Sequence, residues 1–268
     1  MKHNPGIGAT PELSLRASIA TLTRVIFKHP ANGAWMLALE RKVTLLRTEN
    51  GAFAKEKSQP FGGAIRILDL PALHELVGDF RFDSERSRAE QDLRIFIKPA
   101  YWPVLREFCI QHLSQTNDPV FETSPTRELA EEFADALKVN LQSGQYSCHP
   151  IATVVENDPS PTDNIHAKGI STVRVFRIFE AVITDAALVR AILLNGESIR
   201  QEDLYTLAVK GNGRANLILS LPLKRISDHY SAIPLVERTA PVFYEGNQLD
   251  VTVPAILDGI AVPKYQRL

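Results

Sequence analysis

Residues 124–137 read SPTRELAEEFADAL and carry the clearest structural signal in the chain. Ser124 is a favourable N-cap residue and the proline after it suits the first helical position, so we expect a helix to begin here. Glu128, Glu131 and Glu132 stand at positions i, i+3 and i+4, which places their carboxylates on one face of that helix. Apolar side chains on the opposite side can pack inward. The stretch therefore predicts a half-buried helix with an acidic face.

Three clustered carboxylates repel one another and raise each other's pKa unless cations neutralise them. Hard divalent cations such as Mg²⁺ prefer oxygen ligands, so this acidic face is a candidate metal site. Arg127 lies four residues before Glu131 and can support that side chain. The spacing by itself leaves a second interpretation open, in which the helix presents a solvated acidic face to water.

The sequence before this helix begins with strand-like runs. Ala17 to Phe27 and Ala34 to Leu39 are apolar and are separated by a turn with the sequence HPANG, which predicts a β-hairpin. A glycine pair, Gly62 and Gly63, then opens another strand-like run. Adjacent glycines allow a backbone to pass close to another group or to adopt a positive φ.

Between about residues 68 and 120 the sequence is charged and helical in period. We expect one helix at Ser84 to Phe96 and another at Val104 to Leu113. Basic and acidic side chains alternate here, which favours a solvated face with ion pairs over a phosphate-binding patch. We interpret this segment as a helical insertion placed before the acidic helix.

The sequence after the acidic helix predicts two strands and a helix. Pro150 to Glu156 and Ser171 to Ile183 are strand-like, and Asp185 to Leu194 is helical in pattern. Together with the elements before the acidic helix, they predict a mixed α/β chain. We expect a single domain over residues 1–268, with the insertion at about 68–120 and a C-terminal extension at about 195–268.

Composition excludes several classes of protein. The 30 basic and 31 acidic side chains give a net charge of −1, so no overall field attracts nucleic acid. No apolar stretch approaches the roughly 18 residues of a membrane span, and the first ten residues lack the order of a secretory signal. Cys109 and Cys148 have no metal-binding or redox spacing. We expect a reduced, cytoplasmic protein, and the mixed charge is compatible with a homodimer.

The string RELAEE, from Arg127 to Glu132, resembles the R-E-hydrophobic-x-E-E core of the box that defines the Nudix hydrolases. The pair Gly62 and Gly63 resembles the glycines that these enzymes place ahead of the box. The resemblance implies an α/β/α sandwich with a mixed sheet, of the α+β type. It also implies a pyrophosphatase reaction, the cleavage of a nucleoside diphosphate linked to another moiety, with a nucleotide-derived small molecule as the partner.

The resemblance also assigns roles to residues. Glu131 and Glu132 would be the principal ligands of Mg²⁺ or Mn²⁺, and Glu128 a ligand or the catalytic base. Arg127 would orient the glutamates, and the glycine pair would contact the substrate. A further ligand or base in this family comes from a segment after the helix, for which Glu156 and Glu180 are candidates.

Glu180 is the more informative of those two candidates, because a carboxylate inside the apolar run from Val173 to Ile183 is costly unless it is paired, bound or solvated. A substrate-binding role is one interpretation. An ion pair with Arg174 or Arg177 is the other.

The sequence also departs from the family pattern. The nearest acidic residue before Arg127 is Glu122, with four residues between them where the family has seven. Ala134 stands where the family has a glycine, so we expect the helix to continue past that point. Gly62 lies 65 positions before Arg127, a separation that requires an insertion; long loops cost little closure entropy.

Three hypotheses of function follow. The first is a metal-dependent pyrophosphohydrolase. The second is a Nudix-fold module that senses a nucleotide or binds a protein without catalysis. The third is a different α/β fold in which the acidic helix is only a solvated surface.

Overall fold

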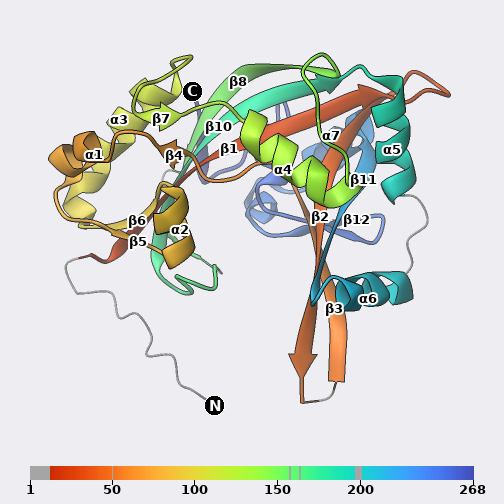
Figure 1. The fold of residues 1–268 in the computed structure, drawn as a ribbon, viewed down its shortest axis with the longest axis horizontal. Helices are drawn as coiled ribbons and strands as arrows, with labels where there is room; N and C mark the ends of the chain where they lie inside the picture. Colours follow the sequence, from red (N-terminus) through yellow and green to blue (C-terminus); the bar gives the residue numbers. More distant parts are fainter. Residues whose placement is uncertain (1–12, 50, 157, 163, 197–200) are drawn as a thin grey trace.

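The apolar run near the N-terminus forms the central strand, β1 (Leu15–Lys28), of a strongly twisted mixed sheet (Figure 1). The computed structural model describes residues 13–49, 51–156, 158–162, 164–196 and 201–268. Strand β10 (Ser171–Ile183) pairs with β1 in parallel along almost its whole length. On the other side, β2 (Trp35–Thr48) pairs with the end of β1 and β6 (Arg94–Ile97) with its beginning. The predicted hairpin of β1 and β2 is confirmed.

The remaining strands extend this sheet in the order β12-β13-β3-β2-β1-β10-β8-β14. Strand β11 pairs with β2, β5 with β6, and β9 with β10, whereas β4 and β7 form a small separate sheet. Their bounds are β3 (Gly51–Gln59), β4 (Arg66–Ile67), β5 (Arg81–Phe82), β7 (Phe121–Glu122), β8 (Tyr146–Glu156), β9 (Ser160–Pro161), β11 (Arg214–Pro222), β12 (Val242–Tyr244), β13 (Asn247–Leu249) and β14 (Tyr265–Arg267).

The α-helices are α1 (Leu70–Val77), α2 (Glu85–Glu90), α3 (Trp102–Leu113), α4 (Thr126–Leu137), α5 (Ala186–Gly196), α6 (Gln201–Lys210) and α7 (Leu223–Ala232). Short 3-10 turns are η1 (Pro99–Tyr101), η2 (Leu235–Thr239) and η3 (Val253–Ile256). In the part of the chain that is described, none of the helices has the length and apolar character needed to cross a membrane.

Successive side chains of β1 point to opposite faces of the sheet, so the strand contributes to a core on each face. Ala17 and Ile19 pack against α1 and α3, and Val25 contributes to the cluster under α4 and α5. Leu22 and Ile26 point to the opposite face, where α7 and η3 cover them. A mixed sheet with helices on both faces confirms the predicted α+β class. The layer on the second face comes from the C-terminal part of the chain.

The insertion contains less helix than the sequence predicted. The helix expected at Ser84 to Phe96 was wrong in its second half, because α2 ends at Glu90 and Gln91 adopts a left-handed conformation with φ 57°. The residues that follow alternate with a period of two and enter the sheet as β6, where Ile95 and Ile97 are fully buried. The helix expected at Val104 to Leu113 is confirmed within α3.

Helix α4 begins at Thr126, one residue later than predicted. Pro125 occupies the N-cap position without a side-chain cap, and the Ser124 hydroxyl accepts a hydrogen bond from the Thr126 N–H at 3.3 Å. The helix continues past Ala134, as expected from the missing glycine. It ends at Leu137, and Lys138 takes the left-handed conformation.

Candidate functional site

Helix α4 is anchored by its apolar side chains on the sheet. Leu129 and Phe133 are fully buried, and the ring of Phe133 lies 5.0 Å from the ring of Phe61. Val25 and Phe27 of β1 belong to the same cluster. This packing fixes the helix so that its glutamates face the backbone that follows Phe61.

The glycine pair lies directly under these glutamates. The segment around it runs antiparallel to β1 in the gap between β2 and β6, with hydrogen bonds from Thr23 N to Phe61 O (2.7 Å) and from Thr21 N to Gly63 O (2.9 Å). Gly62 has φ +139°, and a Cβ atom there would lie 2.1 Å from the Thr21 carbonyl oxygen. A Cβ at Gly63 would lie 2.1 Å from the carboxylate of Glu128. Gly62 therefore requires glycine, because backbone atoms and a positive φ oppose a side chain there, whereas a side chain at Gly63 would have to displace the carboxylate of Glu128.

Glu132 is the most deeply placed of the three helix glutamates. The Gly62 N–H donates a hydrogen bond to its Oε2 at 2.7 Å. Beside it lies Glu40 of β2, which is 1% exposed. Lys42 Nζ lies 2.8 Å from the Glu40 carboxylate and 3.9 Å from that of Glu132. Burial, and secondly the charge of Glu40, raise the pKa of Glu132 well above its ordinary value.

Sequence reasoning missed Glu40 and Lys42. The signal was available, because Glu40 directly follows the apolar strand-like run from Ala34 to Leu39. A carboxylate at the end of such a run must be paired, bound or solvated, as argued for Glu180, since an unpaired buried charge is costly.

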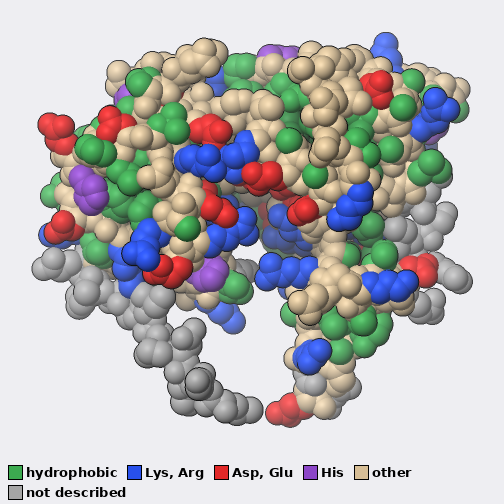
Figure 2. Space-filling view, viewed as in Figure 1, with side chains coloured by type: hydrophobic (Ala, Val, Ile, Leu, Met, Phe, Trp, Pro, Cys, Tyr) green, Lys and Arg blue, Asp and Glu red, His purple; other side chains and the backbone are tan. Residues whose placement is uncertain are grey.

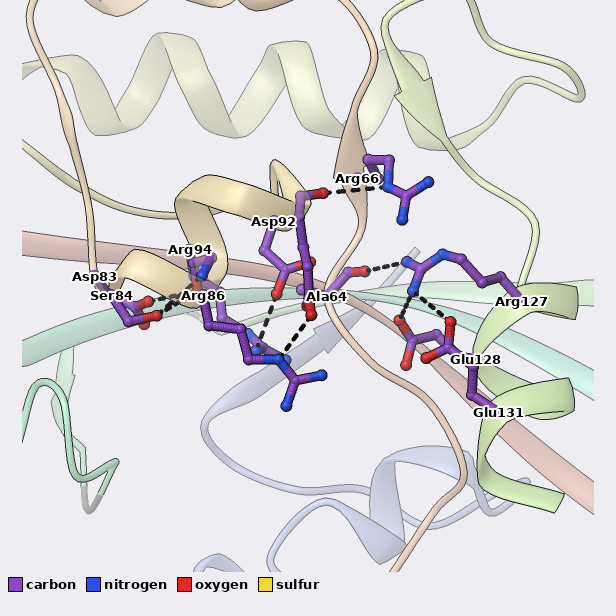
Figure 3. Close-up of polar contacts among 12 residues, drawn as sticks. Ala64, Arg66, Asp83, Ser84, Arg86, Asp92, Arg94, Arg127, Glu128 and Glu131 are labelled. Atoms are coloured by element: carbon purple, nitrogen blue, oxygen red, sulfur yellow. Dashed lines mark hydrogen bonds and ion pairs between the residues drawn. The ribbon is translucent and has the colours of Figure 1, made fainter. Parts of the chain in front are cut away.

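Arg127 ties the other two glutamates together (Figure 3). Its guanidinium contacts Glu128 at 2.6 Å and Glu131 at 3.5 Å, and also Glu122 at 2.9 Å. It donates a further hydrogen bond to the Ala64 carbonyl at 3.4 Å. Although burial lowers the pKa of Arg127, the hydrogen bond that it donates to Glu122 and the charges of the neighbouring carboxylates raise its pKa overall.

The remaining two helix carboxylates differ in exposure. The side chain of Glu128 is 16% exposed, whereas that of Glu131 is 57% exposed. Burial raises the pKa of Glu128, the charge of Arg127 opposes this, and the charge of Glu131 adds to it. The structure thus brings together Arg127 and the three predicted glutamates with the glycine pair, although only Glu128 and Glu132 are largely buried.

The insertion contributes charged groups to the same region. Asp92, Arg86 and Arg94 lie across the backbone of Ala64 from Glu128 (Figure 3). Figure 2 shows acidic and basic side chains gathered in front of α4, beside a hollow between the insertion and strands β2 and β3. Ion pairs on α2 such as Arg86 with Glu90 are solvated, as the sequence predicted. The side chain of Asp92, by contrast, is not solvated, because this residue is only 4% exposed.

Asp92 is expected to make stability depend on pH. Burial raises its pKa to about 6, while Arg94 at 3.3 Å opposes the shift. Because the folded pKa lies above the ordinary value, the folded state holds this proton more tightly, and that contribution to stability is lost as the pH rises through about 6. Asp92→Asn should therefore raise the melting temperature at pH 7.5 but not at pH 4. Equal shifts at the two pH values would contradict this assignment.

Glu180 does not join the helix glutamates. It pairs with Arg24 of β1 and lies 3.6 Å from His149. Its neighbour Ala181 packs in the cluster under α4, so Glu180 points to the other face of the sheet, where Asp258 also contacts Arg24. The alternative of an ion pair with Arg174 or Arg177 named the wrong partner, since sheet register places Arg24 opposite Glu180. The substrate-binding role of Glu180 stays a prediction, and this residue does not contact the helix glutamates in the described structure.

Glu156, the other downstream candidate, lies in a separate buried network. Its carboxylate accepts hydrogen bonds from Ser160 and Arg174, each at 2.7 Å, and Lys264 Nζ lies 3.6 Å away. These basic partners already balance its charge.

The donor chemistry around α4 fits a hard divalent cation. Glu132 and Glu40 are buried carboxylates that share one lysine, and Glu128 is a third oxygen donor on the same side of the helix. No group of three or more acidic, histidine or cysteine side chains is gathered closely enough to hold a metal within the described residues. Mg²⁺, however, is commonly held by one or two carboxylates together with water and substrate phosphates.

Comparison with protein families gives a match over the part of the chain that carries the glycine pair and α4. The family described as "SMODS-associated NUDIX domain" matches residues 45–212, which include the glycine pair, the insertion and α4. Comparison with curated proteins and with solved structures found no match.

Proposed function

Because the chain belongs to the SMODS-associated NUDIX domain family, we propose that it is a pyrophosphohydrolase that acts on a nucleoside diphosphate linked to another moiety. Nudix domains typically use divalent metals, and we propose Mg²⁺ or Mn²⁺ for this one. The observation that carries the proposal is the contact between the glycine pair and α4. The Gly62 N–H donates a hydrogen bond to Glu132, and Gly63 lies against Glu128. The glycine pair and the glutamates meet although the segment 68–120 separates them in the sequence.

In this proposal the metal would be held by one or two carboxylates from the set Glu128, Glu131 and Glu132, together with water and the phosphates of the substrate, and Glu40 is a further candidate ligand. When bound, the cation would stabilise charge on the diphosphate and lower the pKa of the attacking water. Arg127 positions Glu128 and Glu131 through its two ion pairs. Glu128 also suits the role of base, because burial brings its pKa closer to neutral pH than that of a solvated glutamate.

A second candidate, a Nudix-fold module that binds a nucleotide derivative without cleaving it, is favoured by a different observation. Arg127 already contacts Glu122, Glu128 and Glu131, so the protein's own cation offsets part of the repulsion among these carboxylates. A site of that kind can hold its shape without a metal.

Formation of the cleaved products, followed by chromatography of the nucleotides, separates the two candidates, because hydrolysis of a diphosphate linkage yields two phosphate monoesters, or a nucleotide and pyrophosphate, and no free phosphate. The wild type would be incubated with ADP-ribose, dinucleotide polyphosphates and nucleoside triphosphates, with Mg²⁺, with Mn²⁺ or with EDTA. If the protein is a hydrolase, we expect turnover with Mg²⁺ or Mn²⁺ and none with EDTA. Glu131→Gln should reduce it by about tenfold or more, because a ligand is lost from an exposed position.

Glu107→Gln on α3 is a matched control, because this glutamate is also largely exposed and lies outside the site. If no compound is cleaved, the same panel in a thermal-shift assay tests the binding module. Equal turnover by the wild type and Glu131→Gln would remove Glu131 from the proposed site.

A further inference from the structure

A second cavity lies on the other flank of α4. It has a volume of about 400 Å³, is open to solvent on one side, and is lined by the connection from α3 to α4, by the first residues of α4 and by strands β8 and β10. The glycine pair lies on the opposite side of β1 from β10, so this cavity is distinct from the region of Glu128 and Glu132. Glu122, which lines it, is the connection between the two, through its ion pair with Arg127.

Arg177 of β10 is the only basic side chain in the lining that the structure describes, and no carboxylate among the described residues pairs with it. One guanidinium nitrogen donates a hydrogen bond to the Thr153 hydroxyl at 3.1 Å. The guanidinium carbon lies 5.8 Å from the centre of the Phe179 ring. Burial lowers the pKa of Arg177, which shows that its charge is partly removed from water. A partly desolvated guanidinium without a counter-ion favours binding of an anion.

Neither of the two acidic side chains in the lining forms an ion pair with Arg177. Asp118 accepts hydrogen bonds from the N–H groups of Val120 and Phe121 and contacts His112 at 2.7 Å. Glu122 is paired with Arg127 at 2.9 Å. Both carboxylates thus have other partners, and the Arg177 guanidinium is left without a carboxylate partner among the described residues. Because Asp118 and Glu122 also add negative charge to the lining, the cavity suits a ligand with one negative charge better than a dianion.

We propose that this cavity binds a small organic monoanion, in which a carboxylate or a phosphodiester is attached to an apolar body. Arg177 binds the anionic group. Phe179, Phe121 and Pro150 supply an apolar wall for the rest of the ligand. The volume is near the lower end of the range of about 300 to 1,000 Å³ for small-molecule sites, so the ligand is compact.

Cys148 makes the proposal testable, because its thiol lines the same cavity. Its pKa is raised to about 11 by burial, and the other cysteine, Cys109, is fully buried. Iodoacetate and iodoacetamide both alkylate a thiolate with loss of iodide and differ mainly in charge. The ratio of their two rate constants therefore reports attraction of the anion and cancels any change in the thiolate fraction of Cys148.

The proposal predicts that iodoacetate is favoured in the wild type, with a rate that saturates with reagent concentration. Arg177→Gln should lower the ratio of iodoacetate to iodoacetamide by at least about fivefold, because the attracting charge is lost. Arg177→Lys, which keeps the charge, should preserve most of the ratio and guards against a folding defect in the first variant. Arg190→Gln controls for a general loss of positive charge, and Cys148→Ser should abolish labelling. An unchanged ratio in a folded Arg177→Gln protein would overturn the proposal.

Discussion

Glu132→Gln is expected to lower metal-dependent turnover by about a thousandfold and, at the same time, to stabilise the fold at pH 8. Turnover falls because an amide is a poor substitute for a carboxylate ligand. Stability rises because the ionised Glu132 is buried beside Glu40, where desolvation and repulsion destabilise its charge. Glutamine carries no charge and avoids this cost. The hydrogen bond from the Gly62 N–H can be kept by the amide oxygen. Steady-state kinetics and thermal melts in EDTA measure the two effects separately.

The stability effect of Glu132→Gln should depend on pH in a defined direction. The pKa of Glu132 is raised in the folded state, so the wild type loses stability as the pH rises from the ordinary glutamate pKa through the folded value. The variant has no proton to lose at this position. The difference in melting temperature should therefore be small at pH 4 and grow toward pH 8. A variant that melts lower than the wild type at pH 8 in EDTA would contradict the assigned environment of Glu132.

Gly62→Ala is expected to destabilise the protein by about 3 to 5 kcal/mol. The new Cβ would lie 2.1 Å from a backbone oxygen of β1, and that strand is held on its other side by β10. The backbone also has φ +139°, which an alanine rarely adopts. For a chain of this size, the melting temperature should fall by about 10 °C, as measured by calorimetry or circular dichroism.

Two further glycine variants separate the causes of this loss. Gly144 has φ +97° and nothing within 4 Å of an added Cβ, so Gly144→Ala measures the cost of the backbone conformation alone. At Gly63 the obstacle is the carboxylate of Glu128, which can swing away, so Gly63→Ala should cost less stability and act mainly on the site. If Gly62→Ala were no worse than Gly144→Ala, the close approach to β1 would be wrong.

The insertion is part of the site as well as a covering for the sheet. Its strand β6 extends the sheet beside β1, and this places Asp92 and Arg94 within reach of the charges on α4. If the proposed function holds, we expect some of the groups that distinguish one nucleotide derivative from another to come from residues that the family motif does not include. Arg66 and Arg86, which are drawn near Ala64 in Figure 3, are the first positions to vary in a study of substrate preference.

The sequence by itself determined the features that depend on neighbours along the chain. The acidic helix, its continuation past Ala134 and the β1–β2 hairpin all follow from short-range periodicity and turn residues. The string RELAEE, from Arg127 to Glu132, carried the resemblance to the Nudix family, and that resemblance included a glycine pair placed ahead of the helix.

Tertiary structure decided the features that depend on which segments meet. Whether Arg94–Ile97 would be helix or strand was decided by the free edge of β1, and the partner of Glu180 was decided by the register of β10 against β1. Glu40 reaches Glu132 only because β2 passes under α4. Burial, and with it the pKa of each carboxylate, is set by groups distant in the sequence, so a local pattern can propose a site but cannot show which of its charges are desolvated.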